Sequence, residues 1–323
     1  MDVLSDAITA MRTGRAHSAR TERRSPWAVR HPSFAGAGFH VVLQGICRLV
    51  ADGSPPIVLG AGDVVFLPHG TAHEMADPFS EPPAAPRLTP LVGLHDQTSP
   101  DRPGASTVTL CGAYLLDRAR PHPLINELPE VVHLPARVGH DPSLRAAIDL
   151  LGAELKTRRP GADVNIPALL DTLLVQMLRG WLDQQSASGT AVGWAAALHD
   201  PAIVAALSGI HSDPARPWTV EDLSARAGLS RAAFARRFSE LVGRPPLRYL
   251  TWWRLTTAAR LLRDSDAPLA TVAHHVGYTS EFAFANAFKR EYGLAPGRYR
   301  AGPQPRARRD TRRTSTPDTH TGH

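Results

Sequence analysis

Residues 218–300 read WTVEDLSARAGLSRAAFARRFSELVGRPPLRYLTWWRLTTAARLLRDSDAPLATVAHHVGYTSEFAFANAFKREYGLAPGRYR. Within this stretch a helix–turn–helix pattern occurs twice, first over residues 219–238 and again over residues 269–288. In each copy a glycine, which accepts the left-handed conformation that ends a helix, comes just before a serine that can cap the next helix. These pairs are Gly228 with Ser230 and Gly277 with Ser280. The pattern predicts an all-helical domain that binds DNA through two helix–turn–helix units.

Local start signals support the same helices. Thr219 is an N-cap for the first unit, and Asp222 follows it in a carboxylate variant of the capping box. Pro245 and Pro246 favour a helix start, because proline is tolerated in the first turn. They begin one long helix that we expect to join the two units.

The second helix of each unit has one apolar face for the core and an opposite face that can enter a DNA groove. Phe234 and Phe238 form the core side in the first unit, and Phe284 and Phe288 do so in the second. Small side chains on the outer face let a helix lie close in the major groove, while an arginine reaches a base edge or a phosphate. Phe282 also lies on the outer face. We predict DNA contacts from Arg231, Ala232, Ala235, Arg236, Ser280, Glu281, Ala283, Ala285, Asn286 and Lys289.

Length and charge indicate two domains with different partners. The chain has 323 residues, enough for two domains. Residues 1–198 carry 17 Lys/Arg against 19 Asp/Glu, whereas residues 199–300 carry 14 against 9. An acidic first part joined to a basic second part suits a sensor attached to a polyanion binder. No apolar run is long enough to span a membrane and no secretory signal is present, so we expect a cytoplasmic protein without membrane contact.

The first part of the chain is β-rich. Residues 27–120 lack helical periodicity and carry short apolar runs, such as FHVVLQG and IVLGAGDVVFLP, between glycine and proline clusters. Short apolar runs separated by turn residues predict a compact antiparallel barrel or sandwich. Before it, residues 1–24 predict a helix with Leu4, Ile8 and Met11 on one face, followed by a basic turn over RTERR. Cys47 and Cys111 are expected to be small buried residues rather than a disulfide.

Helical periodicity returns from Pro142 onward. The segment NIPALLDTLLVQMLRGWLDQQ has apolar residues around more than one face. That width suits a helix packed in its own domain or one that also meets a second subunit, and both interpretations stay open. The expected domains are a sensor or dimerisation domain over 1–185, a small-residue linker over 186–198, a DNA-binding domain over 199–300 and a disordered basic tail over 301–323.

One segment of the first domain resembles the second motif of the cupin barrel. In GDVVFLPHGTAH the matching positions are Gly62, Pro68, Gly70 and His73. The first cupin motif is degraded: counting back from Gly45, its glutamate position holds Gly38, and its two histidine positions hold His31 and Ser33. Of the four positions that ligate metal in metal-binding cupins, His31 and His73 remain. Two donors are too few for a divalent ion. His40, His95 or His122 could add a donor, but nothing in their spacing requires it, so we expect no metal, no cofactor and no catalytic residue.

The helical domain resembles the AraC/XylS family of transcriptional regulators over 218–300. The first unit carries the turn at Ala225, Gly228 and Ser230, with Phe234, Arg236 and Phe238 after it. The second unit carries the family signature at Gly277, Tyr278, Ser280, Phe284, Asn286, Phe288, Lys289, Gly293, Pro296, Tyr299 and Arg300. The cupin-like part is similar to the sensor barrel found upstream in members of the same family.

This resemblance implies an α+β protein of two domains. An N-terminal cupin-like β-barrel with flanking helices would precede an all-α domain with two helix–turn–helix motifs joined by a long linking helix. Bases would be read through Ala232, Ala235 and Arg236 in the first unit, and through Glu281, Ala283, Ala285 and Asn286 in the second. Asn286 stands where an arginine is frequent in the family, and asparagine prefers adenine to guanine. The second unit is therefore expected to add less base specificity.

The implied function is sequence-specific regulation of transcription, with activation or repression left open. Double-stranded operator DNA and RNA polymerase are the expected partners, and a homodimer is a further one. The barrel would hold a small organic effector near His40 and His73. A different class of function also remains open, a metal-dependent cupin enzyme that uses His31, His73 and a third ligand and is fused to a DNA-binding domain. A barrel that is only an interaction module is the third interpretation.

Overall fold

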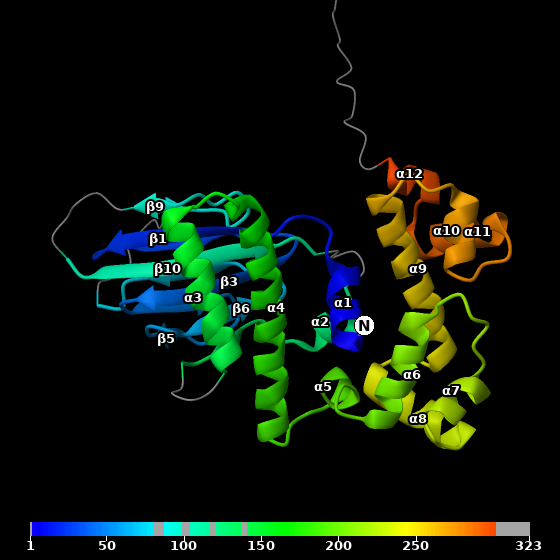
Figure 1. Ribbon diagram of the computed structural model, residues 1–323. Helices are drawn as coiled ribbons and strands as arrows, with labels where there is room; N and C mark the ends of the chain where they lie inside the picture. The colour runs from blue at the N-terminus through cyan, green and yellow to red at the C-terminus, as the bar shows by residue number, and fades with distance from the viewer. Residues whose placement is uncertain (1, 80–86, 99–103, 117–120, 137–140, 302–323) are drawn as a thin grey trace, which may run out of the picture.

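The computed structural model describes residues 2–79, 87–98, 104–116, 121–136 and 141–301. A β-sheet domain and a helical domain lie side by side, with the first helix between them (Figure 1). The α+β class and the two-domain architecture expected from the sequence are confirmed. The basic tail expected over 301–323 lies, apart from Ala301, outside the described residues.

The β-domain consists of two sheets packed face to face. The larger sheet has the order β11-β6-β3-β10-β1-β9 and the smaller one β5-β4-β7-β2-β8. The strands are β1 His17–Arg24, β2 Ala28–His31, β3 Ala37–Gln44, β4 Cys47–Ala51, β5 Ile57–Leu59, β6 Val64–Leu67, β7 His73–Ala76, β8 Arg87–Leu88, β9 Gln97–Thr98, β10 Ser106–Tyr114 and β11 Val132–Leu134. Most neighbouring strands in each sheet pair antiparallel, as the sequence predicted for a cupin-like barrel.

The larger sheet is buried on both faces, which explains the continuous apolar runs. Alternate side chains of β3, such as Phe39 and Val41, join the core under the helices. The other side chains of the strand, such as Val42, face the smaller sheet and pack with Leu49 and Met75. Two long helices, α3 Pro142–Thr157 and α4 Ala162–Ala187, lie across the outer face of this sheet (Figure 1).

The basic segment RTERR is a strand and not a turn. It belongs to β1, which pairs antiparallel with β10 from His17↔Ala113 to Arg24↔Ser106. Burial alternates along the strand, with Ala19, Thr21 and Arg23 facing inward. The inward Arg23 donates a 2.5 Å hydrogen bond to Thr21 Oγ1, which satisfies a cation that otherwise would be costly to bury.

Three short helices fill the space between the two domains. They are α1 Val3–Met11, α2 Pro123–Glu127 and α5 Gly193–Ala197. The last of these lies inside the range expected as a linker, and its Trp194 is fully buried. The carboxylate of Glu127 at the end of α2 accepts a 2.6 Å hydrogen bond from the backbone N–H of Trp194.

The helical domain contains the two predicted helix–turn–helix units. Its helices are α6 Pro201–Ser212, α7 Val220–Arg226, α8 Arg231–Val242, α9 Pro246–Asp264, α10 Leu269–His275, α11 Glu281–Tyr292 and α12 Pro296–Arg300. Thr219 and Asp222 form the capping box that the sequence predicted. Gly277 in the second turn has a φ of +84°, and a side chain there would meet the backbone of Ala215, so both space and conformation require glycine.

The long helix α9 connects the two units (Figure 1). Its first half packs with α6, α7 and α8, and these residues belong to a core that continues through α1, α5 and α4 into the β-domain. Its second half forms a separate core with α10 and α11. The first unit is therefore built into the same core as the β-domain. Among the described residues, no helix is long and apolar enough to cross a membrane.

Candidate functional site

The second helix of the first unit, α8, presents the predicted surface. Ser230 caps it, accepting from the backbone N–H of Ala233, and Phe234 and Phe238 anchor its inner side with no exposed surface. Of the predicted contacts, Arg231, Ala232 and Arg236 are exposed and Ala235 is half-buried. The helix therefore has a narrow outer strip of two alanines between arginines, which can approach the floor of a DNA groove.

The three arginines of α8 have different roles. Arg231 pairs with the exposed carboxylate of Glu221 at 2.9 Å. Arg237 donates to the carboxylate of Asp200, whose side chain is only 5% exposed and also caps α6 by accepting from Ala202 N and Ile203 N. Within the described chain Arg236 has neither an ion pair nor a side-chain hydrogen bond. The guanidinium of Arg236 is thus exposed and without a partner among the described residues, whereas Arg237 holds α8 to α6.

The second unit repeats this construction on α11. Ser280 caps the helix by accepting from Ala283 N, and Phe284 and Phe288 lie in the core. On the outer side Glu281, Ala283, Asn286 and Lys289 are exposed and Ala285 is half-buried. Phe282, next to Glu281 in the first turn, is 76% exposed. A large aromatic side chain at this position can contact a thymine methyl group, a role that the sequence analysis did not give it.

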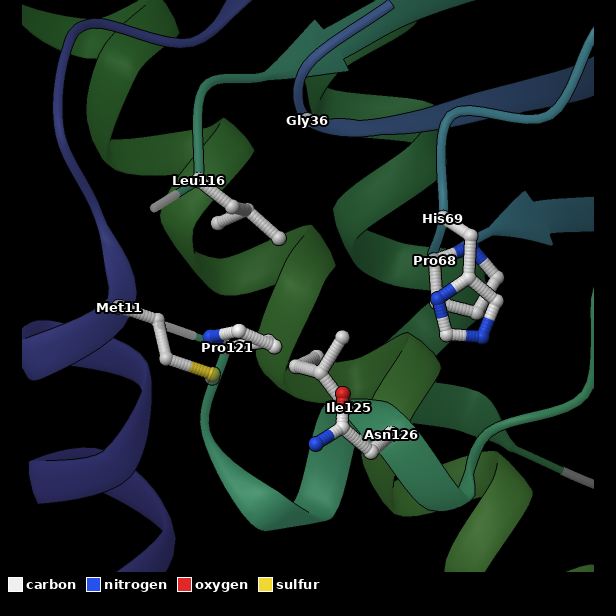
Figure 2. A pocket seen from close by; sticks show the side chains of 8 residues that line it. All are labelled: Met11, Gly36, Pro68, His69, Leu116, Pro121, Ile125 and Asn126. Atoms are coloured by element: carbon white, nitrogen blue, oxygen red, sulfur yellow. The ribbon is translucent and has the colours of Figure 1, made fainter. Parts of the chain in front are cut away.

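A cavity of about 210 Å³ lies where the barrel rim meets α1 and α2 (Figure 2). Met11, at the end of α1, lines one side, and Ile125 and Asn126 of α2 line another. His69 adds a polar side chain to the lining, and its Nε2–H donates a 2.8 Å hydrogen bond to the carbonyl of Leu128. The full lining is Met11, Gly36, Pro68, His69, Leu116, Pro121, Ile125 and Asn126. The sequence could not indicate this cavity, because its residues come from six separate segments.

The helix that borders this cavity also contacts the helical domain. Asp6 of α1 lies 3.3 Å from Nδ1 of His211 in α6, and His211 Nε2 lies 2.8 Å from the hydroxyl of Tyr249 in α9. The imidazole stacks on Trp253, with ring centroids 3.7 Å apart. Burial lowers the pKa of His211, an effect that Asp6 opposes. After α1 ends, the carbonyl of Arg12 accepts a hydrogen bond from Arg263 near the end of α9.

The two histidines predicted to bind an effector lie deep between the sheets. His40 and His73 are buried, and their Nε2 atoms are 2.7 Å apart. His31 lies beside them, with ring centroids about 5 Å away. Burial lowers the pKa of His31 to about 3 and that of His73 to about 4, and it holds the pKa of His40 well below its usual value. All three are neutral imidazoles at neutral pH, and none lines the cavity of Figure 2.

Comparisons with known proteins agree with this architecture. The family model described as "Cupin" matches residues 2–183, and the one described as "Helix-turn-helix domain" matches residues 223–302. A protein of Streptomyces lividans named as an AraC-like transcription regulator is 38% identical, over 94% of this chain and 99% of its own. The RCS-specific HTH-type transcriptional activator RclR of Escherichia coli is 30% identical, over 85% of this chain and 89% of its own.

Solved structures also share sequence with the helical domain. The DNA-binding domain of AdpA in complex with a target DNA is 37% identical, and the match covers 32% of this chain and 91% of that domain with a TM-score of 0.30.

Proposed function

Because the chain belongs to the AraC-like transcription regulators, with an N-terminal cupin domain, we propose that α8 and α11 bind successive major-groove segments of one operator. The main support is that α8 and α11 are built alike. Both helices begin at a capping serine, bury two phenylalanines and expose small residues beside a basic one. Two helices with the same exposed face can each contact bases in a major-groove segment of the same duplex.

The side chains of the two helices divide into reading and positioning groups. Arg236 can donate two hydrogen bonds to a guanine, and Asn286 can form a bidentate pair with an adenine. We assign the exposed Arg231 and Lys289 to phosphates, which position the protein without reading sequence; for Arg231 this requires exchanging its ion pair with Glu221 for the DNA. The helix N-termini at Ser230 and Ser280 add backbone N–H groups for the same purpose.

We further propose that the cavity of Figure 2 is where a small effector acts on the cupin domain. Its volume suits a compact molecule, smaller than a drug-sized ligand. The apolar walls from Met11, Leu116 and Ile125 and the polar groups of His69 and Asn126 favour an apolar body with one or two hydrogen-bonding groups. The earlier candidates His40 and His73 remain an alternative effector site.

The proposed route from the effector to the DNA runs through α1 and α2. Met11 also borders a small crevice with Trp252 and Thr256 of α9, so a ligand that moves Met11 moves the contact with the linking helix. The link between Glu127 and Trp194 carries a displacement of α2 into α5, which packs on α8. An effector shifts the equilibrium only through different contacts in the two arrangements of these helices.

Regulation is preferred to the enzyme interpretation because the relatives over the full chain are named as transcriptional regulators. We propose RNA polymerase and a second copy of the chain as further partners, acting in the cytoplasm where the DNA is. The apolar residues Leu170, Leu173 and Met177 of α4 are buried within their own chain, so they do not form the interface with a second copy.

The proposal is tested by mapping bound chromosomal sites in cells that express the full chain, together with transcript levels of the adjoining genes. Asn126→Trp fills the cavity from an exposed position, and Val164→Trp on the exposed side of α4 is the matched control. We expect the control to match the wild type and Asn126→Trp to change occupancy or transcription at the same sites. Absence of discrete bound sites would refute the regulator. Unchanged occupancy and transcription for Asn126→Trp would refute the effector cavity alone.

A further inference from the structure

Three histidines from both sheets meet inside the barrel. His31 ends β2 and His73 begins β7 in the smaller sheet, while His40 comes from β3 in the larger one. One ring nitrogen from each lies within 4.8 Å of the other two, and all three residues are buried. We propose that this cluster binds one first-row transition-metal ion of the zinc, nickel and copper group through His31, His40 and His73.

The rings of His31 and His73 are oriented as metal ligands usually are. Nδ1 of His31 lies 2.6 Å from the carbonyl of Thr89, and Nδ1 of His73 lies 2.7 Å from the carbonyl of Thr71. A carbonyl only accepts, so each Nδ1 carries the proton and each Nε2 keeps a lone pair. A backbone acceptor that fixes the far nitrogen in this way is the usual outer support of a metal-bound histidine.

The third histidine is supported from the opposite side by a row of polar side chains. Because Nε2 of His73 has only a lone pair, His40 donates from Nε2 across the 2.7 Å contact, and its Nδ1 accepts from the Cys111 thiol at 3.0 Å. Cys111 Sγ lies 3.2 Å from Thr109 Oγ1, which lies 2.7 Å from Thr21 Oγ1. Arg23 stands at the far end of this row as a donor to Thr21.

Binding an ion requires one internal proton shift. The proton of His40 leaves Nε2 and is carried on Nδ1, which then donates to Cys111 Sγ, and the thiol turns its hydrogen toward Thr109 Oγ1. No proton is gained or lost by the protein, since the imidazole is neutral before and after. Each of the three histidines then has an unprotonated Nε2, and one ring nitrogen of each lies within 4.8 Å of the other two.

The donor set and the spacing fit a metal of this group. Three imidazoles without a carboxylate suit zinc, copper or nickel, whereas calcium and magnesium require oxygen ligands. Metal–nitrogen bonds of about 2.0–2.1 Å at tetrahedral angles place ligand nitrogens roughly 3.3 Å apart. The 2.7 Å separation of His40 and His73 therefore has to open by a few tenths of an ångström, and His31 has to approach.

The cluster differs from the set of ligands that the cupin motifs provide. His31 and His73 occupy motif positions, but Ser33 and Gly38 replace the other two donors. His40 is not one of the motif ligands: it stands at a variable position of the first motif, two residues after the glutamate position, and β3 brings it against His73 of β7. From the sequence we expected no metal, because no spacing required His40, His95 or His122 to join His31 and His73; the structure brings His40 to both. The ion would tie the two sheets together, a property separate from DNA binding by α8 and α11.

The test uses the untagged full chain, stripped with a chelator and then titrated with Co²⁺ followed by absorption and with Zn²⁺ followed by calorimetry. We expect one ion per chain. His40→Ala should weaken binding by more than about 100-fold, and Cys111→Ser, which changes only the support of His40, by about 10- to 100-fold. His17→Ala, an exposed histidine of the same domain, is the matched control and should bind as the wild type does.

Circular dichroism of each metal-free variant shows whether it is folded. X-ray absorption of the zinc-loaded wild type provides a measurement that needs no variant, and it should show three imidazole ligands. The proposal is overturned if the wild type lacks saturable one-to-one binding, if His40→Ala folds and binds as tightly as His17→Ala, or if the absorption spectrum shows zinc bound mainly by oxygen or sulfur. Operator binding by the wild type is measured separately, so its success or failure does not decide this result.

Discussion

Adjacent arginines on α8 should respond to alanine substitution in opposite ways. Arg236 has no partner within the described chain, so Arg236→Ala removes nothing from the folded state and should leave the melting temperature unchanged. Arg237 holds the nearly buried carboxylate of Asp200, so Arg237→Ala leaves that charge with only its two backbone donors. The two variants therefore separate DNA reading from the packing of the helix.

The magnitudes follow from these environments. A hydrogen bond to a charged group contributes about 1.5–3 kcal/mol. The side chain of Arg237 is 55% exposed and Asp200 keeps its capping bonds, so we expect a loss of about 1–2 kcal/mol, or about 2–8 °C in melting temperature. Loss of a bidentate contact from Arg236 to guanine costs about 1–3 kcal/mol, which weakens operator affinity by about 5- to 150-fold.

The assay combines thermal unfolding of the full chain with fluorescence anisotropy on an operator selected from random-sequence DNA. Salt concentration must be the same throughout, because phosphate contacts make affinity salt-dependent. The assignment of Arg236 is refuted if Arg236→Ala binds the operator as the wild type does. The assignment of Arg237 is refuted if Arg237→Ala melts at the wild-type temperature.

Three further predictions concern the junction, the second reading helix and acid stability. Trp194→Ala should cost about 3–5 kcal/mol of unfolding free energy in urea titrations, because it empties a fully buried site between α2 and α9; a loss below 1 kcal/mol would contradict that packing. Phe282→Ala should leave stability unchanged because the ring is exposed, and should reduce operator discrimination at a thymine; equal affinities for thymine and uracil versions in the wild type would remove this contact. The unfolding free energy should fall below pH 6.5, because burial lowers the pKa of His31 to about 3 and that of His73 to about 4, so the unfolded chain binds protons that the folded chain does not. Each of these histidines adds a slope of about 1.4 kcal/mol per pH unit between its folded and unfolded pKa values. An unfolding free energy that stays constant from pH 7 to 5 in the metal-free protein would contradict this prediction.

The helical domain could be predicted from sequence because its signals are local. The capping box at Thr219, the glycine turns and the capping serines act within a few residues, and the spacing of the phenylalanines fixes the buried face of each helix. The outward positions of α8 and α11 follow from the same periodicity. Their exposure agrees with the sequence analysis, while their contacts with DNA remain predictions.

The parts that sequence reasoning missed depend on pairing between distant segments. The charged segment RTERR was predicted to be a turn, but it pairs with β10 as the second strand from the edge of the larger sheet, where alternate side chains become buried. The roles of Arg237 and His40 depend on Asp200 and His73, partners from other elements. The range 186–198 has linker composition, yet Trp194 gives it a buried anchor; that tryptophan was the available signal.

The central claim is that two helices of one chain read one operator, and hydroxyl-radical footprinting of the full chain on its selected DNA tests it most directly. We expect two protected segments on one face of the duplex, about 10–10.5 base pairs apart, with Arg236→Ala weakening one and Asn286→Ala the other. A single protected segment, or two segments that both disappear only with Arg236→Ala, would contradict it.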